Sequence, residues 1–355
     1  MFDIEDYTYV LPEDRIAQKP CERRDASRLL RLDRNTGAIS HHVFGDLPEF
    51  IMPGDVLVIN DTKVIPGRLL GRKDTGGKAE VLILSYAESL AAQKAPDEFY
   101  CTCLVKCSKK PHVGSMLYFD EGLRAEIIAP ESDHFRLKFT CDGDFNVILN
   151  RTGKVPLPPY IRRNAGDSGT SSADNASYQT IYAAARGAIA APTAGFHFTP
   201  DLMLRLREKN VQVVALTLHV GYGTFIPVRV SDIREHRMHH ESFSLSADAA
   251  ATINSAKAAG HRVIAVGTTS VRTLEYCADA DGRLAASTGS CDLFIYPGYR
   301  FKVVDAMITN FHLPKSTLLM LVSAFAGRGH ILDAYAEAVS AGYRFYSYGD
   351  AMLIN

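Results

Sequence analysis

Residues 68–156 follow a two-residue period that their flanks do not share, and this change of period limits the possible folds more than any other feature. The stretch contains six short runs separated by Gly, Asp, Pro and Ser: KAEVLILS, EFYCTCLVKC, SMLYFD, LRAEIIA, HFRLKFT and FNVILN. Such alternating, turn-bounded runs predict strands of an antiparallel sheet or a small β-barrel. The prolines of VPLPPYI then prevent helix formation and indicate the exit from this unit.

The flanking segments alternate between strand and helix patterns. SRLLRLD and DVLVIND are strand-like, and Thr199-Pro200 begins a helix that returns as the apolar strand VQVVALTLHV. Ser246 caps the next helix before the strand RVIAV; GTTS leads into the helix VRTLEYCA. The segment DLFIY, the helices STLLMLVSAFAG and ILDAYAEAVSA and the strand YRFYSY complete the chain.

This order predicts an α/β protein. We expect residues 1–67 and 157–355 to form one discontinuous α/β domain with a mixed sheet. An inserted antiparallel β-barrel domain, residues 68–156, interrupts it. The polar segment 164–177 is expected to be a surface loop.

Composition excludes several classes of protein. A chain of 355 residues favours two domains, and its net charge of −1 argues against a generally basic coat for nucleic acid. No apolar run is long enough to cross a membrane, and the acidic N-terminal segment is unlike a signal peptide. Seven cysteines over this length do not indicate a disulfide framework, so we expect a cytoplasmic protein.

Two clusters raise the question of a metal. Cys101, Cys103 and Cys107 lie at even spacings and share one face of a strand, but the spacing fits no zinc pattern, so buried thiols are expected. The segment 234–241, REHRMHHE, lacks the H-E-x-x-H order. We therefore expect no metal, and acid–base or hydrogen-bonding roles for its histidines and Glu241.

Five turns combine small residues with a hydroxyl or amide and an ionisable group. They are INDTK (59–63), PTAGFHF (192–198), LHVGYGTF (218–225), GTTSVR (267–272) and TNFHLPKS (309–316). Ligands of open α/β sheets bind at the carboxyl ends of strands, so these turns predict one shared cleft. In GTTSVR three hydroxyls stand at a helix N-terminus, which suits a carboxylate or one phosphate, although N-capping explains any single hydroxyl equally well.

The glycines of LHVGYGTF do not complete a known nucleotide-binding pattern. The dinucleotide fingerprint requires a third glycine that is missing, and His219 stands where methyltransferases commonly have an acidic residue. What remains is a tight turn at Gly221 and Gly223 that lets a ligand approach the backbone.

His197, in TAGFHFTP, has two interpretations. It is either a core histidine with satisfied ring nitrogens or an imidazole delivered by a strand end to the mouth of a site. We favour the second.

Four basic pairs also occur, and those sharing one face would follow a phosphate backbone; they are Arg23-Arg24, Arg72-Lys73, Lys109-Lys110 and Arg162-Arg163.

Taken together, the motifs resemble one family over the whole chain. NDTKVIPGRL, VPLPPYI, YQTIYA, GAIAAPTAGFHFT, LHVGYGTFIPV, HRMHHE, AVGTTSVRTLE, TNFHLPKSTLLMLVSAF and YRFYSYGDAMLI occur in the order of the S-adenosylmethionine:tRNA ribosyltransferase-isomerases of queuosine synthesis. The departures are Gly67 where alanine is usual, Phe196 where leucine is usual, and a longer polar loop at 164–177.

The resemblance implies the same fold, an α/β domain with an inserted β-barrel. It also implies a tRNA substrate with 7-aminomethyl-7-deazaguanine at the wobble position and S-adenosylmethionine as a consumed ribosyl donor. The products would be epoxyqueuosine in tRNA, adenine and methionine. No metal or other cofactor is expected, and we expect a monomer.

The implied chemistry needs a base, an acid for the departing adenine and a dry pocket, and histidine suits both proton transfers. The candidate catalytic residues are His197, His219, His239, His312 and Glu241. Thr268, Thr269 and Arg272 are expected to hold the methionine carboxylate, and Asp61 or Asn310 the ribose or purine edge. The remaining candidate binding residues are Lys63, Thr193, Gly195, Gly221, Gly223, Thr224, Ser270 and Lys315.

Two other functions compete with this hypothesis. A conventional methyltransferase would release S-adenosylhomocysteine, but the glycine turn argues against it. An RNA-binding module would bind without turnover, but the near-neutral charge and the histidine-bearing turns argue against it.

Overall fold

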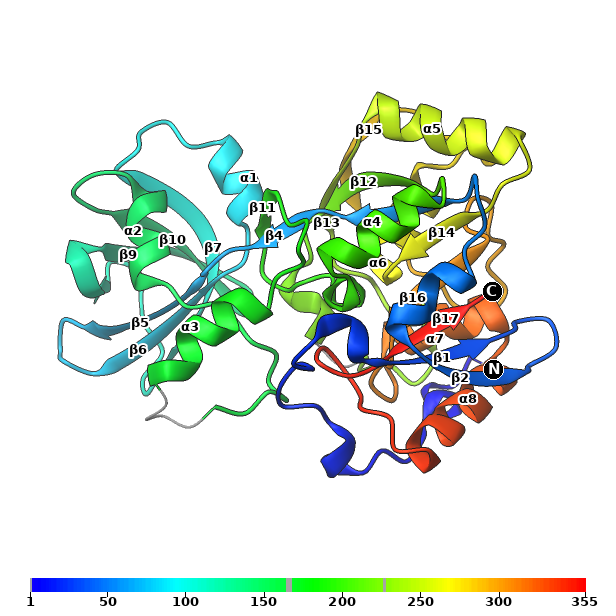
Figure 1. The fold of residues 1–355 in the computed structure, drawn as a ribbon. Coiled ribbons are helices and arrows are strands. Elements are labelled where there is room, and N and C mark those ends of the chain that lie inside the picture. The colour runs from blue at the N-terminus through cyan, green and yellow to red at the C-terminus, as the bar shows by residue number, and fades with distance from the viewer. Residues whose placement is uncertain (1, 164–167, 226–227) are drawn as a thin grey trace.

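The computed structural model describes residues 2–163, 168–225 and 228–355. Its strands form a nine-stranded mixed sheet and a closed antiparallel barrel of six strands, which lie side by side in Figure 1. A short parallel pair, β4 (Thr62–Val64) and β11 (Ala185–Ala188), lies between them. The predicted fold class is therefore confirmed, and the exact domain limits stay a prediction.

Five of the six alternating runs form strands of the barrel, and β5 (Arg68–Lys73) is a sixth strand that was not among those runs. The other five strands are β6 (Lys78–Ile83), β7 (Glu98–Cys107), β8 (Met116–Tyr118), β9 (Arg124–Glu131) and β10 (His134–Thr140), and all six are joined in the order β10-β7-β6-β5-β8-β9. The buried side chains of these strands, such as Val81 and Leu137, stand at alternate positions, because successive residues face opposite sides of a strand. Cys101 and Cys103 share this inner face and are buried as expected, while Cys107 is half-buried. Helix α1 (Tyr86–Ala91) connects β6 to β7.

The prediction of a strand at FNVILN is wrong, because this run is helix α2 (Phe145–Thr152). Asp144 caps the helix by accepting hydrogen bonds from the backbone N–H groups of Asn146 and Val147. Phe145, Ile148 and Leu149 are buried at helical spacing, and Phe145 stacks on Phe99 of the barrel at 4.3 Å between ring centroids. The buried face of the helix is therefore part of the barrel core.

The nine-stranded sheet has the order β15-β13-β12-β3-β14-β16-β17-β1-β2. Its strands are β1 (Arg28–Leu32), β2 (Ile39–Val43), β3 (Val56–Asn60), β12 (Gln212–Leu218), β13 (Glu241–Leu245), β14 (Val263–Val266), β15 (Ser287–Cys291), β16 (Ala306–Asn310) and β17 (Ala351–Ile354). The helices beyond the barrel are α3 (Ser168–Ser177), α4 (Pro200–Glu208), α5 (Ala247–Ala258), α6 (Thr268–Cys277), α7 (Thr317–Ala326) and α8 (Arg328–Ser340). Thr199 and Ser246 cap α4 and α5 as predicted.

The centre of this sheet positions the site. Strands β12, β3, β14 and β16 are neighbours and run parallel, so their carboxyl ends meet at one edge. Their buried residues are almost all apolar, which is typical of parallel strands covered on both faces. Four of the five predicted turns follow these four strands directly.

Two further expectations need correction. Residues 168–177 of the polar segment form helix α3, while 164–167 lie outside the described residues. Arg163 forms an ion pair with Asp174, and Arg24 donates to the carbonyls of Ala176 and Gln179, so distant arginines hold this helix. YRFYSY is not a strand: Tyr346 has a φ of 70°, and the strand is β17, a few residues later.

Within the described residues, no helix is both long and apolar enough to span a membrane.

Candidate active site

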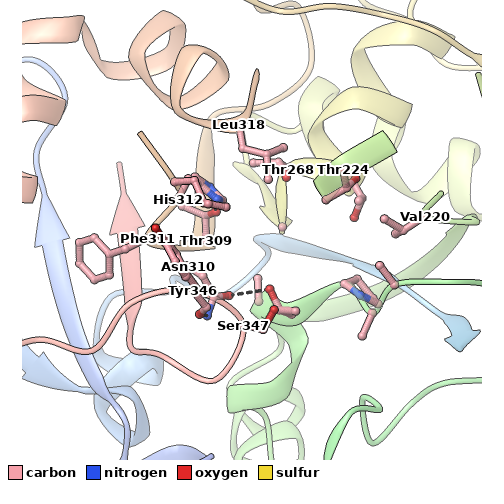
Figure 2. Close-up of a pocket in the computed structure, with 18 of the residues that line it drawn as sticks. Val220, Thr224, Thr268, Thr309, Asn310, Phe311, His312, Leu318, Tyr346 and Ser347 are labelled. Carbon is pink, nitrogen blue, oxygen red and sulfur yellow. Dashed lines mark hydrogen bonds between the residues drawn. The ribbon is translucent and has the colours of Figure 1, made fainter. Parts of the chain in front are cut away.

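A cavity lies at the carboxyl ends of the central strands, and we call it the strand-end cavity. It encloses about 750 Å³ of space that no atom fills, including the part open to solvent. Figure 2 shows Thr309, Asn310 and His312 on one side of it and Val220 and Thr224 on the other. Seven of the predicted site residues line it: Thr193, Thr224, Thr268, Thr269, Arg272, Asn310 and His312.

Asn60, which the sequence analysis did not select, ties the strand ends together. Its side-chain N–H groups donate to the carbonyl of Leu218 at 3.0 Å and to Thr269 Oγ1 at 3.1 Å. Its side-chain oxygen accepts from the backbone N–H groups of Thr62 and Leu218, each at 3.1 Å. One buried amide thus joins β3, β12 and the start of α6. A polar residue closing the apolar run VLVI was the available signal.

Helix α6 directs its N-terminus at the cavity. Gly267 stands at the N-cap with a φ of 85°, a backbone conformation that favours glycine. Thr268 and Thr269 follow in the first turn and line the cavity. The N-terminal end of the helix also carries a partial positive charge. Ser270 does not share this role, because it is buried and its Oγ donates to the carbonyl of Val266 at 2.8 Å.

Asn310 separates the cavity from His197. Its Oδ1 accepts from Thr193 Oγ1 at 3.2 Å, and its Nδ2 donates to the carbonyl of Tyr346 at 3.1 Å and lies 3.3 Å from His197 Nε2. The His197 Nδ1 atom is bonded to Ser27 Oγ at 2.7 Å, and the ring stacks on Phe44. Both ring nitrogens are therefore occupied within the protein.

His197 itself is buried, and it does not line the strand-end cavity. Burial lowers its pKa to about 3, which makes the imidazole neutral at physiological pH. The expectation that TAGFHFTP ends a strand is wrong, because Thr193–His197 is a 3-10 helix. This geometry agrees with the core interpretation and gives His197 the position of a support behind Asn310; its catalytic role stays a prediction.

His312 is the predicted histidine that lines the cavity. Its Nε2 is bonded to Thr309 Oγ1 at 2.8 Å, and its backbone N–H donates to the hydroxyl of Tyr335 at 3.0 Å. Burial lowers its pKa to about 3. A neutral imidazole therefore lines the cavity, and burial opposes its protonation.

Glu241 stands behind Arg272. The Glu241 carboxylate and the Arg272 guanidinium form a buried ion pair in which each side chain is 5% exposed. Glu241 Oε1 also accepts from the backbone N–H of Gly221 at 2.8 Å, which holds the glycine turn. Arg272 donates through Nε to the carbonyl of Leu293 at 3.0 Å. Arg272 reaches the cavity as half of a neutral pair.

The other predicted residues do not line the cavity. His219 Nδ1 is bonded to Thr62 Oγ1 at 2.8 Å, and burial lowers its pKa. Asp61 accepts from Thr217 Oγ1 at 2.6 Å, and Lys63 is exposed. Lys315 forms an exposed ion pair with Glu5 at 2.6 Å.

The glycines among them serve close packing. A Cβ on Gly195 would lie 2.2 Å from the hydroxyl oxygen of Tyr182, and one on Gly223 would lie 2.3 Å from the ring of His239. His239 is exposed beside the glycine turn.

Across the described ranges, no three His, Cys, Asp or Glu side chains are grouped closely enough to hold a metal ion.

Comparisons with known proteins show the family of the chain. A family model described as queuosine biosynthesis protein matches residues 4–354. The S-adenosylmethionine:tRNA ribosyltransferase-isomerases of Moorella thermoacetica and Syntrophotalea carbinolica are 52% and 49% identical to the chain, with 99% of both sequences covered in each case. A crystal structure of the S-adenosylmethionine tRNA ribosyltransferase of Thermotoga maritima is 36% identical, with a TM-score of 0.54 over 99% of this chain and 100% of that one. The chain therefore belongs to the queuosine biosynthesis family of ribosyltransferase-isomerases and is an enzyme of the transferase class.

Proposed function

We propose that the enzyme transfers the ribosyl group of S-adenosylmethionine to 7-aminomethyl-7-deazaguanine at the wobble position of tRNA and isomerises it. The products are epoxyqueuosine in tRNA, adenine and methionine. The observation that carries the proposal is the strand-end cavity, because the motifs that resemble the family meet there around His312.

The cavity offers partners to two charged groups of S-adenosylmethionine, the carboxylate and the sulfonium. The N-terminus of α6, with Thr268 and Thr269, suits the methionine carboxylate, because free backbone N–H groups and the helix dipole favour an anion. The rings of Tyr160 and Tyr346, with centroids 4.6 Å apart, also line the cavity and suit the sulfonium through cation–π attraction.

We assign both proton transfers to His312. As the neutral base it takes a proton from the ribosyl carbon bonded to sulfur, and the electron pair left on that carbon is stabilised by the adjacent sulfonium. The imidazolium then returns the proton to the departing adenine, which restores the neutral ring that burial favours. The amine of the tRNA base bonds to the sugar, and closure of the epoxide breaks the carbon–sulfur bond and releases methionine.

We further propose that the reaction uses no metal or additional cofactor and that the enzyme acts as a monomer. The sulfonium itself supplies both the electron sink and the leaving group. Since S-adenosylmethionine is consumed, it is a substrate.

A product assay tests the proposal. The purified enzyme is incubated with S-adenosylmethionine and tRNA that carries the deazaguanine amine, and small molecules and nucleosides are identified by mass. Free adenine and methionine with epoxyqueuosine in the tRNA are expected. S-adenosylhomocysteine would identify a methyltransferase instead, and tRNA binding without turnover would identify a binding module.

A matched pair of variants locates the base. His312→Gln removes the imidazole that lines the cavity, whereas His219→Gln removes one that does not. We expect adenine release to be lost in the first and retained in the second.

A further inference from the structure

Two more hollows lie outside the strand-end cavity. The first, which we call the junction cleft, is lined by Pro156–Pro159 and by barrel residues that include Arg68 and Lys106. It holds about 1180 Å³ of space, including the part open to solvent. Its wall is shared with the strand-end cavity: Tyr160 and Ala190 line the cavity, while their chain neighbours Ile161 and Ile189 line the cleft.

The second hollow, the barrel groove, lies on the outer face of β5, β6, β7 and β8. It holds about 1600 Å³ of space, including the part open to solvent. Its lining residues include Leu70, Arg72, Lys78, Lys106, Tyr118 and Phe119. Glu80 and Lys106 line both the groove and the junction cleft. The junction cleft and the barrel groove therefore form one path, which begins beside the strand-end cavity.

Charge along this path is mostly basic. Arg72, Lys78 and Lys106 are exposed, and none forms an ion pair with any residue the structure describes. Glu80 is paired with Arg68 at 2.7 Å, Arg163 of the cleft is paired with Asp174, and Asp120 lies at the groove. Lys106 lies opposite Glu80 on the neighbouring strand, whereas Arg72 and Lys78 have no such carboxylate opposite them. These exposed cations on a chain of net charge −1 favour a polyanion at this place.

Apolar surface lies among these cations. Leu70 and Tyr118 are each 44% exposed in the groove, which is unusual for large apolar side chains. Gly71 lets Phe119 pack closely against the backbone, since a Cβ there would lie 2.5 Å from the ring of Phe119. Exposed aromatic rings beside basic side chains are the pattern by which proteins hold single-stranded nucleic acid, because bases stack on the rings and phosphates pair with the cations.

We propose that the junction cleft admits the modified base to the strand-end cavity and that the barrel groove holds the unpaired nucleotides beside it. Lys78, Arg72 and Lys106 bind phosphates of the anticodon loop, and Tyr118 stacks on one of its bases. This assignment rests on the proposed function, which supplies a tRNA whose target base is in a loop. It places the tRNA on the β5–β8 side of the barrel rather than on β10.

Binding of a fluorescently labelled anticodon stem-loop, measured by anisotropy at several salt concentrations, tests the proposal without requiring turnover. The double variant Lys78→Glu/Lys106→Glu is expected to weaken binding by roughly tenfold or more at 0.15 M salt, with the slope of log affinity against log salt falling by about 0.7 for each lost phosphate contact. Arg136→Glu is the matched control, because Arg136 is exposed on β10, which does not line the path.

A second pair of variants tests stacking. Tyr118→Ala is expected to weaken binding by roughly fivefold or more, while Tyr118→Phe keeps the ring and the affinity. Weakening by the lysine variant with no effect of Tyr118→Ala would overturn the proposal, since a duplex held by its backbone needs no stacking ring. Equal affinities for the wild type, the lysine variant and Arg136→Glu would also overturn it.

The turnover assay separates the two proposals. If the wild type makes epoxyqueuosine, the lysine variant should raise KM for tRNA and leave KM for S-adenosylmethionine unchanged. If the wild type binds the stem-loop through the groove but releases no adenine, the proposed function fails while the groove assignment stands.

Discussion

The burial of His197 predicts a measurable dependence of stability on pH. The folded protein lowers the pKa of His197 from 6.5 to about 3, so below pH 6.5 the unfolded chain binds a proton that the folded chain does not. The contribution of the neutral His197 side chain to the free energy of unfolding is therefore complete above pH 6.5 and is lost as the pH falls toward 3. At pH 5, which is 1.5 units below 6.5, the loss amounts to about 2 kcal/mol.

The perturbation is His197→Asn, whose amide does not titrate and still reaches the hydroxyl of Ser27. The free energy of unfolding is measured by urea titration at pH 7 and pH 5, at constant ionic strength. The decrease from pH 7 to pH 5 should be about 2 kcal/mol smaller in the variant than in the wild type. Ser27→Ala is the control, because it removes the hydrogen bond to Nδ1 but keeps the titrating ring. Equal decreases in the wild type and His197→Asn would refute the reasoning.

Further predictions concern the groups around the cavity. Glu241→Gln leaves the Arg272 guanidinium buried without a counterion and should lower the free energy of unfolding by about 3 kcal/mol, whereas Glu121→Gln, in an exposed ion pair, should not change it detectably; urea titration measures both. Asn60→Ala leaves three buried backbone groups unpaired and should cost roughly 3 kcal/mol by the same method. His312→Gln should lower kcat for adenine release by about 100-fold or more with little change in melting temperature, and an unchanged kcat would exclude it as the base.

The parallel core and the barrel strands could be predicted because burial leaves a simple periodic trace. The four central strands are apolar runs followed by polar turns, and parallel neighbours necessarily bring those turns to one edge. The run FNVILN shows where this reasoning fails, since six residues fit both a strand and a helix. The cap at Asp144 and the helical spacing of Phe145, Ile148 and Leu149 were present in the sequence and would have decided the question.

The site was predicted in outline and not in detail. Threonines after β14 and the pair Asn310 and His312 after β16 line the cavity, because the strand itself carries them to its edge. His197 lies instead behind Asn310, since its position depends on Ser27 and Phe44, which are far away in the sequence. Local patterns contain no information on such distant partners.

The strand order also has a consequence for synthesis of the chain on the ribosome. All six barrel strands pair with partners made between residues 68 and 140, so the barrel can close while later residues are still being added. The hairpin β1–β2 is made before it but reaches the large sheet only through β17, which lies between β1 and β16. The nascent protein therefore carries an exposed strand edge until residues 351–354 emerge, and the large sheet is completed last.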